Sequence, residues 1–192
     1  MKLKILHKSF YERDTKIVAV NLLGKILVRK INSKKILCKI VETEAYYGKE
    51  DPASRVSLGR PRYCVELMYG DVGKCLIYMV HSNWLFNIVA HSKNGVGAIL
   101  IRAVEPLDEK LKEKINLFNG PGKLTKTLKI TKSDLGKRVY DKSSDIIICK
   151  TNKGEKIEFE NSHRIGVKKD LDLKLRFFIK NNPFVSTKAG NR

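Results

Sequence analysis

Three apolar runs follow one another closely in the middle of the chain, at residues 74–80, 84–90 and 97–103. Each has the length of a strand, and the connections His81-Ser82-Asn83 and Ser92-Lys93-Asn94-Gly95 contain residues that favour turns. Connections this short can join antiparallel neighbours, whereas parallel strands need a crossover of about a dozen residues or more. The sequence therefore predicts an antiparallel meander at the centre of the fold.

A second strand pair is predicted upstream, where residues 25–31 and 35–42 are typical of the two arms of a hairpin. The second arm continues to residue 46. Because side chains alternate along a strand, Glu42, Glu44 and Tyr46 would share one face. An edge strand with solvated acids would give the same spacing, so the pattern alone does not assign chemistry to these residues.

The rest of the chain is predicted to surround these strands with helices, loops and short strands. At 192 residues the chain is long enough for one well-buried core and short for two, so we expect a single domain over residues 1–192. The expected elements are an irregular arm at 1–8, a helix from Asp14 or Thr15 to Gly24, a loop from Gly48 to Gly73, helices at 106–115 and from Gly120, and strands at 145–149, 156–159, 164–167 and 175–179.

The charge of the chain indicates the class of its partner. Lys and Arg number 39 against 20 acids, a formal net charge of +19, and such self-repulsion is best tolerated when the partner is a polyanion such as nucleic acid. The alternative is that the lysines serve solubility and ion-pair networks. No segment approaches the roughly 18 apolar residues of a membrane span. We therefore expect a cytoplasmic, nucleoid-associated protein with no membrane partner.

The cysteines and histidines do not predict a metal site. Cys38, Cys64, Cys75 and Cys149 are widely spaced, with no CxxC pair, and the four histidines are equally dispersed. The sequence thus predicts reduced, mostly buried thiols, and neither a metal nor another cofactor is expected.

Several residues could carry chemistry, although each has a simpler explanation. Glu44 near Arg102 would be a carboxylate held ionised as a general base, or an ordinary ion pair. Tyr46 and Tyr78 could stack on a planar ligand, although an aromatic on a strand more often belongs to the core. The segment from Gly120 to Lys123 offers backbone N–H groups and a lysine to a phosphate, but it lacks the full pattern of a nucleotide-binding loop.

Taken together and in this order, these segments resemble the alkyladenine (3-methyladenine) DNA glycosylase family. The resemblance runs from about Asn21 to Ser186 and is most specific in Glu-Thr-Glu-Ala-Tyr at 42–46 and Arg-Ala-Val-Glu-Pro at 102–106. The other matching segments are Leu76-Ile77-Tyr78, Gly120 to Leu124, Arg164 to Val167, Leu175-Arg176-Phe177 and Pro183 to Ser186.

The resemblance implies an α+β fold in which helices surround a curved antiparallel sheet, and a metal-free enzyme that flips a damaged purine out of double-stranded DNA and hydrolyses its glycosidic bond. The purines implied are alkylated or deaminated ones, of the 3-methyladenine and hypoxanthine class, and a monomer is expected. By this resemblance Glu44 is the general base, Arg102 helps to hold the attacking water, and the backbone carbonyl of Ile165 is the third anchor of that water. The positive charge and Lys123 would grip DNA phosphates.

The resemblance also implies which residues bind the base. Tyr46 and Tyr78 match aromatics that sandwich it, and Asn87 matches the asparagine that crowds the exocyclic amine of guanine. Two positions depart from the family pattern: Arg55 stands where a pocket histidine is usual, and His81 where many members have a tyrosine wedge.

Two questions stay open at this point. The residue that fills the gap left in the duplex is His81 or Trp84. The chain is either a glycosylase or a basic protein that binds modified or unpaired bases without cutting. The presence of Glu44 and Arg102 together favours the enzyme, since binding alone has no need of a base beside the pocket.

Overall fold

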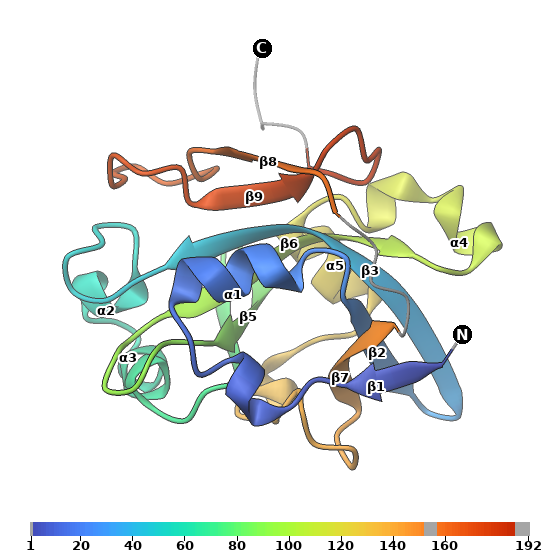
Figure 1. Ribbon diagram of the computed structural model, residues 1–192, viewed down its shortest axis with the longest axis horizontal. Helices are drawn as coiled ribbons and strands as arrows, with labels where there is room; N and C mark the ends of the chain where they lie inside the picture. The colour runs from blue at the N-terminus through green and yellow to red at the C-terminus, as the bar shows by residue number, and fades with distance from the viewer. Residues whose placement is uncertain (1, 152–156, 187–192) are drawn as a thin grey trace.

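A computed structural model describes residues 2–151 and 157–186, and within them the chain forms one antiparallel sheet surrounded by short helices (Figure 1). The strands are β1 (Leu3–Ile5), β2 (Ile26–Ile31), β3 (Lys34–Tyr46), β4 (Cys75–Val80), β5 (Asn83–Val89), β6 (Ala98–Pro106), β7 (Ile146–Thr151), β8 (Phe159–Ser162) and β9 (Arg176–Ile179). Their order is β1-β7-β2-β3-β6-β5-β4, with β9 paired to β3 and β8 to β9. The predicted α+β fold, hairpin and meander are confirmed.

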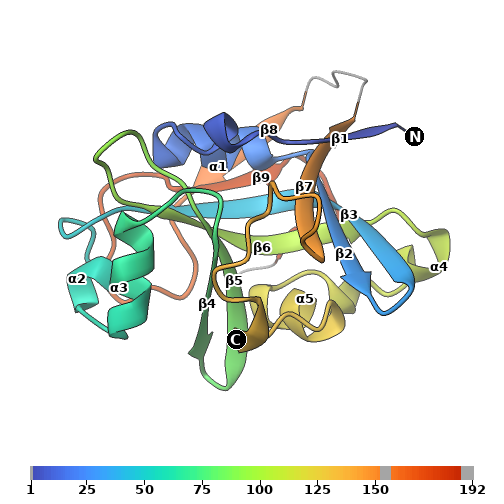
Figure 2. The same cartoon turned by 90° about the horizontal axis from the view of Figure 1, so that it is seen from below.

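The helices gather at the two ends and on the faces of the sheet. They are α1 (Thr15–Leu22), α2 (Arg55–Leu58), α3 (Arg62–Tyr69), α4 (Glu109–Lys112) and α5 (Pro121–Thr127), with 3-10 turns at Lys8–Phe10, Ile115–Leu117 and Lys132–Asp134. Figures 1 and 2 place α2 and α3 at one end of the curved sheet and α4 at the other. None of the helices in the described ranges is both long and apolar enough to cross a membrane.

The long strand β3 is where the sheet branches. One edge pairs with β6, while the other pairs first with β2 and then with β9. The register between β3 and β6 skips Val41 on one strand and Arg102 on the other, on either side of Glu42. Such bulges bend strands and re-aim side chains. They therefore place Arg102 at the most irregular point of the central strand pair.

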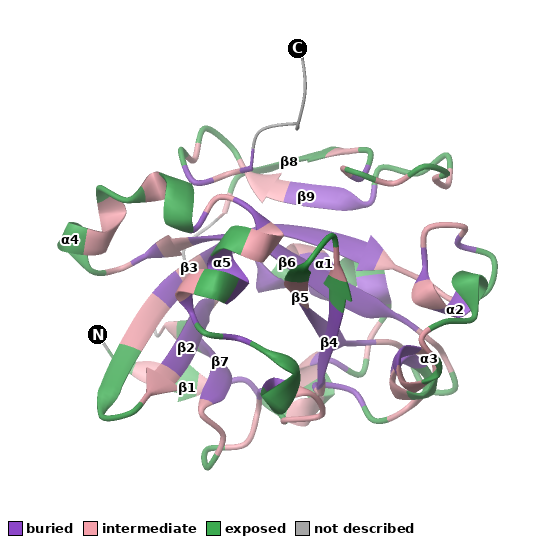
Figure 3. Ribbon diagram, turned by 180° about the vertical axis from the view of Figure 1, so that it is seen from behind, coloured by how far each residue is buried: buried purple, intermediate pink, exposed green. Residues whose placement is uncertain are grey.

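Helix α1 covers the side of β3 opposite the two glutamates. The Asp14 carboxylate caps it by accepting hydrogen bonds from two backbone N–H groups of the first turn. The hydroxyl of Thr43 on β3 donates to the carbonyl of Ala19 at 3.0 Å, and that of Thr15 donates to the carbonyl of Ala90 at 2.9 Å. Buried residues run through the central strands, while the hairpin tips and outer helix surfaces are exposed (Figure 3). Helix α1 thus holds β3 in place from the face opposite Glu42 and Glu44.

A smaller hydrophobic cluster lies under α2 and α3. It includes Val56, Met68 and Tyr78, and Tyr46 packs against it. Burying large apolar side chains typically stabilises a fold by about 1.5–3 kcal/mol each, so this cluster holds both tyrosines in place. Helix α5 lies against β5, where the Thr125 hydroxyl donates to the carbonyl of Trp84 at 2.8 Å.

Five sequence predictions about local structure were wrong or incomplete. The helix predicted at 106–115 is confined to α4, because Pro106 is the last residue of β6. Residues 3–5 form a strand paired with β7, and the predicted loop at 48–73 contains α2 and α3. The predicted strand at 164–167 is a turn, because Gly166 adopts a φ of +76° that favours glycine and breaks the extended run. The strand predicted at 156–159 begins instead at Phe159; residue 156 lies outside the described residues.

Candidate active site

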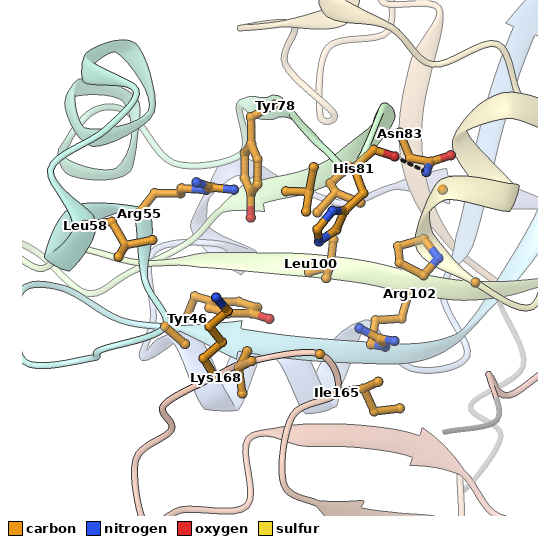
Figure 4. A pocket seen from close by; sticks show the side chains of 18 of the residues that line it. Tyr46, Arg55, Leu58, Tyr78, His81, Asn83, Leu100, Arg102, Ile165 and Lys168 are labelled. Atoms are coloured by element: carbon orange, nitrogen blue, oxygen red, sulfur yellow. Dashed lines mark hydrogen bonds between the residues drawn. The ribbon is translucent and has the colours of Figure 1, made fainter. Parts of the chain in front are cut away.

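A pocket of about 880 Å³ opens where β3, β6, the β4–β5 hairpin, α2, α5 and the 165–169 turn meet (Figure 4). The two glutamates of β3 stand directly behind it. Its lining brings together most of the residues singled out in the sequence, namely Tyr46, Arg55, Tyr78, His81, Arg102, Lys123 and Ile165. Segments that lie more than 100 positions apart in the chain therefore meet in a single cavity.

Glu44 is fully buried and is held at both of its carboxylate oxygens. Oε2 accepts a hydrogen bond from the Tyr46 hydroxyl at 2.8 Å and from the Arg102 guanidinium at 3.2 Å. Oε1 accepts from the backbone N–H of Ile165 at 2.8 Å. Burial raises the pKa of Glu44, although Arg102, the Ile165 N–H and the Tyr46 hydroxyl oppose that shift. The result is a carboxylate more basic than an exposed glutamate.

Arg102 joins the two glutamates of β3. Its Nε donates to Glu42 at 3.1 Å and its Nη1 to Glu44 at 3.2 Å, and its side chain is 8% exposed. Burial alone would lower the pKa of Arg102, but the two carboxylates raise it, so the guanidinium stays charged. The sequence prediction that Glu42, Glu44 and Tyr46 share one face agrees with these contacts.

Glu42 anchors this ion pair to the far end of the chain, a role that the sequence did not predict. It accepts a hydrogen bond from Arg176 on β9 at 2.6 Å, and from the hydroxyl and backbone N–H of Ser186 at 2.8 and 2.7 Å. A buried charge is tolerated only when it is paired and hydrogen-bonded. These donors hold the Glu42 carboxylate in place, and Glu42 in turn holds Arg102.

Tyr46 is held between Glu44 and Arg164, another residue whose role the sequence did not predict. The Arg164 guanidinium lies 4.5 Å from the centre of the Tyr46 ring, within the range of a cation–π contact. The same guanidinium makes a two-pronged pair with Asp51, at 2.7 Å on each oxygen, and donates to the carbonyl of Ala45 at 2.9 Å. The sequence showed an arginine directly before Ile165 and an aspartate at position 51. It gave no sign that these two side chains pair with each other.

Tyr78 faces Arg55, which extends from the first position of α2. The guanidinium of Arg55 lies 4.4 Å from the centre of the Tyr78 ring, and Figure 4 shows it approaching from the side where Leu58 lies. Burial raises the pKa of Tyr78, with Arg55 opposing that shift. The phenol therefore stays neutral, and one side of the ring is occupied by a cation.

The tip of the β4–β5 hairpin forms one lip of the pocket. His81 and Ser82 adopt φ values of +46° and +60° and make the tight turn, which leaves His81 exposed beside the cavity. Gly122 lets α5 approach this hairpin, since a Cβ there would lie 2.8 Å from the Cβ of Asn83. Trp84 packs against the main core and does not line the pocket, whereas His81 does.

Asn87 does not reach the cavity surface. It is 1% exposed, and its amide donates to the carbonyls of Leu76 at 3.1 Å and of Leu85 at 3.5 Å. Its partner across the sheet, Leu100, lines the pocket instead. A role for Asn87 in base recognition stays a prediction.

The lining carries positive charge only. Five of the described residues that line the pocket are Lys or Arg, and no described lining residue is Asp or Glu.

In the part of the chain that the structure describes, no group of three or more His, Cys, Asp or Glu is arranged to hold a metal ion. All four cysteines are buried, and none of them is in a disulfide.

Comparison with known proteins identifies the family of this chain. The family profile described as methylpurine-DNA glycosylase (MPG) matches residues 9–183. A protein of Aeropyrum pernix is 41% identical over 95% of this chain and 93% of its own length, and one of Bdellovibrio bacteriovorus is 38% identical over 96% and 100%. A Clostridium perfringens protein is 37% identical over 95% of this chain and 99% of its own length, and all three are named "Putative 3-methyladenine DNA glycosylase". The chain therefore belongs to the methylpurine-DNA glycosylase family.

Proposed function

We propose that this chain is a monofunctional DNA glycosylase, which flips an alkylated or deaminated purine into the pocket and hydrolyses its N-glycosyl bond. Family membership gives the enzyme class, a hydrolase of N-glycosyl bonds. The observation that carries the proposal is the buried Glu44 carboxylate, held by Arg102 and by the Ile165 N–H directly behind a pocket with two tyrosines. A protein that only binds DNA would have no use for a buried carboxylate that can act as a general base.

The carboxylate can act on water and on charge at once. Oε2 already accepts two hydrogen bonds, whereas Oε1 accepts only that of Ile165 within the described residues, so Oε1 keeps a free acceptor site for a water proton. Cleavage of an N-glycosyl bond builds positive charge on the sugar, which a nearby carboxylate stabilises while it deprotonates the attacking water. Glu44 would thus fill both roles.

Water has to gain access to Glu44 during the reaction, because its side chain is fully buried in the free protein. Its cover consists of Tyr46, Arg102 and Ile165, all of which line the pocket. Catalytic contacts often assume their working geometry only with substrate bound. We expect a base stacked on Tyr46 to shift this cover and admit the water.

DNA binding is assigned to the rim of the pocket. A base inside a duplex has to be swung out before an enzyme can reach its glycosidic bond, and the gap has to be filled. His81 at the hairpin tip would fill it, and Lys123, with the +19 net charge, would neutralise phosphates of the duplex. We expect a monomer associated with the nucleoid.

The deciding assay uses a duplex oligonucleotide with a single hypoxanthine, incubated with the protein and then treated with alkali. A strand break at the lesion shows base release. A gel shift without a break would show that the protein binds modified bases without excising them.

Trapping with borohydride tests whether the chemistry is hydrolytic. Water attack leaves an intact abasic strand and no covalent complex. A protein–DNA adduct would reveal an amine nucleophile and contradict the monofunctional assignment.

A further inference from the structure

Each of the two pocket tyrosines has an arginine guanidinium stacked on one face of its ring. Arg164 lies 4.5 Å from the centre of Tyr46 and Arg55 lies 4.4 Å from the centre of Tyr78. A cation–π contact uses the negative charge of the ring face, which is the same feature that would attract a cationic ligand. Each stacked arginine therefore makes its tyrosine a poorer partner for a second cation.

The two arginines differ in how their charge is balanced. Arg164 is paired with Asp51 and Asp170, and its side chain is fully buried. Arg55 is half-buried at the pocket and makes no ion pair within the described residues. None of the described lining residues is Asp or Glu, so no carboxylate at the cavity surface neutralises the charge of Arg55.

The two lesion classes of the proposed function differ in charge. Alkylation of a purine ring nitrogen, as in 3-methyladenine, leaves a positive charge on the base while it is still attached to the sugar. Deamination of adenine gives hypoxanthine, which is neutral. A cation beside the binding site therefore opposes the binding of cationic alkylated purines, but not the binding of neutral hypoxanthine.

We infer that Arg55 is a specificity-determining residue that biases the pocket toward neutral purine lesions and against cationic ones. This inference rests on the proposed glycosylase function. It concerns the ratio of the two activities, since a cationic base also leaves more easily once it is bound.

The size of the effect follows from the geometry. A base stacked on the far face of Tyr78 would lie at most about 9 Å from the guanidinium, from the 4.4 Å of the cation–π contact and the roughly 4.5 Å of an offset stack. For two unit charges at that distance, with an effective dielectric constant of about 20, screened Coulomb repulsion lowers binding about tenfold at 0.01 M salt and about fourfold at 0.1 M. Any closer placement of the base strengthens the effect.

The test compares release of 3-methyladenine from methylated duplex DNA with release of hypoxanthine from a matched duplex, by wild type, Arg55→Met, Arg55→Lys and Arg62→Met. Arg55→Met removes the charge, Arg55→Lys keeps it, and Arg62 is a control because its side chain is 91% exposed and outside the pocket lining. We expect Arg55→Met to raise the ratio of 3-methyladenine to hypoxanthine release about tenfold at 0.01 M salt, and the other two variants to keep it within about twofold of wild type.

A second measurement needs only the wild-type protein. Because both duplexes carry the same phosphates, salt effects on DNA binding cancel in the ratio, which should rise about threefold from 0.01 to 0.1 M salt as the repulsion is screened. An unchanged ratio for Arg55→Met, an equal change for Arg62→Met, or a wild-type ratio independent of salt would overturn the inference. Release of neither base by the wild type would instead refute the proposed function.

Discussion

Replacing Arg164 with methionine is expected to lower the free energy of unfolding by about 3–5 kcal/mol, the usual cost of removing one partner of a buried ion pair. Both side chains of the Arg164–Asp51 pair are fully buried, and the substitution leaves the Asp51 carboxylate without its cation. Asp51 keeps the backbone N–H groups of Tyr47 and Ala53 at 2.9 and 3.0 Å, which places the expected loss near the lower end of that range.

Urea denaturation at neutral pH measures this loss, with Arg62→Met as the exposed control. Asp51→Asn alone should also destabilise, and the Arg164→Met/Asp51→Asn double variant should lose less than the sum of the two single losses, because the partners act on each other. A loss below about 1 kcal/mol for Arg164→Met, with an unchanged dependence on urea, would show that the buried Arg164–Asp51 pair contributes little to the stability of the fold.

The same pair gives a dependence on pH with a defined sign. Burial would raise the pKa of Asp51, but the hydrogen bonds that it accepts from Arg164 and from the backbone N–H groups of Tyr47 and Ala53, together with the charge of Arg164, more than offset this, and the net shift is downward. A carboxyl whose pKa is lowered by folding contributes stability above its unfolded pKa of about 3.9, and that stability is lost as the pH falls through the folded value. Between neutral pH and about pH 3, the free energy of unfolding should therefore fall less for Arg164→Met than for the wild type.

Three further changes test other parts of the account. Lys123→Ala should reduce the slope of log K against log salt for duplex binding by about 0.9, the contribution of one phosphate, and an unchanged slope would place Lys123 off the DNA. Gly122→Ala puts a Cβ about where Asn83 already packs, 2.8 Å away, so it should displace the hairpin tip and slow excision while the protein stays folded; excision at the wild-type rate would show that the tip is not needed there. Asp134→Asn breaks the buried pair with Arg29 at 2.8 Å and should cost about 3 kcal/mol in urea denaturation, whereas an unchanged midpoint would show that the pair is dispensable.

The strands and the shared face of the site followed from local patterns, which is why the sequence predicted them. Alternation along β3 was enough to place Glu42, Glu44 and Tyr46 together, and short turn-forming connections were enough for the β4–β5–β6 meander. Helix α2 was missed because it has only four residues, too few for a periodic pattern, and α3, with eight, is also shorter than the window of about 11 residues over which helical periodicity is read.

The contacts that hold the site rigid could not be predicted, because they join segments distant in sequence. Arg164 reaches Asp51 across 113 positions, and Ser186 reaches Glu42 across 144. The bulge at Arg102 depends on the register of β3 against β6, which no single segment encodes. The backbone N–H of Ile165 contacts Glu44 from a turn, where the sequence predicted a strand at 164–167.

The central claim is that Glu44 activates the water, and single-turnover excision of hypoxanthine by Glu44→Gln tests it most directly. The substitution keeps the shape of the side chain but removes the proton acceptor, so the rate should fall by about 10² to 10⁴ while duplex binding is retained. The wild-type rate should also fall on acidification, at a pH above that expected for an exposed glutamate, because burial raises the pKa of Glu44. Excision by Glu44→Gln within about threefold of wild type, with the same acid limb, would contradict the assignment of Glu44 as the general base.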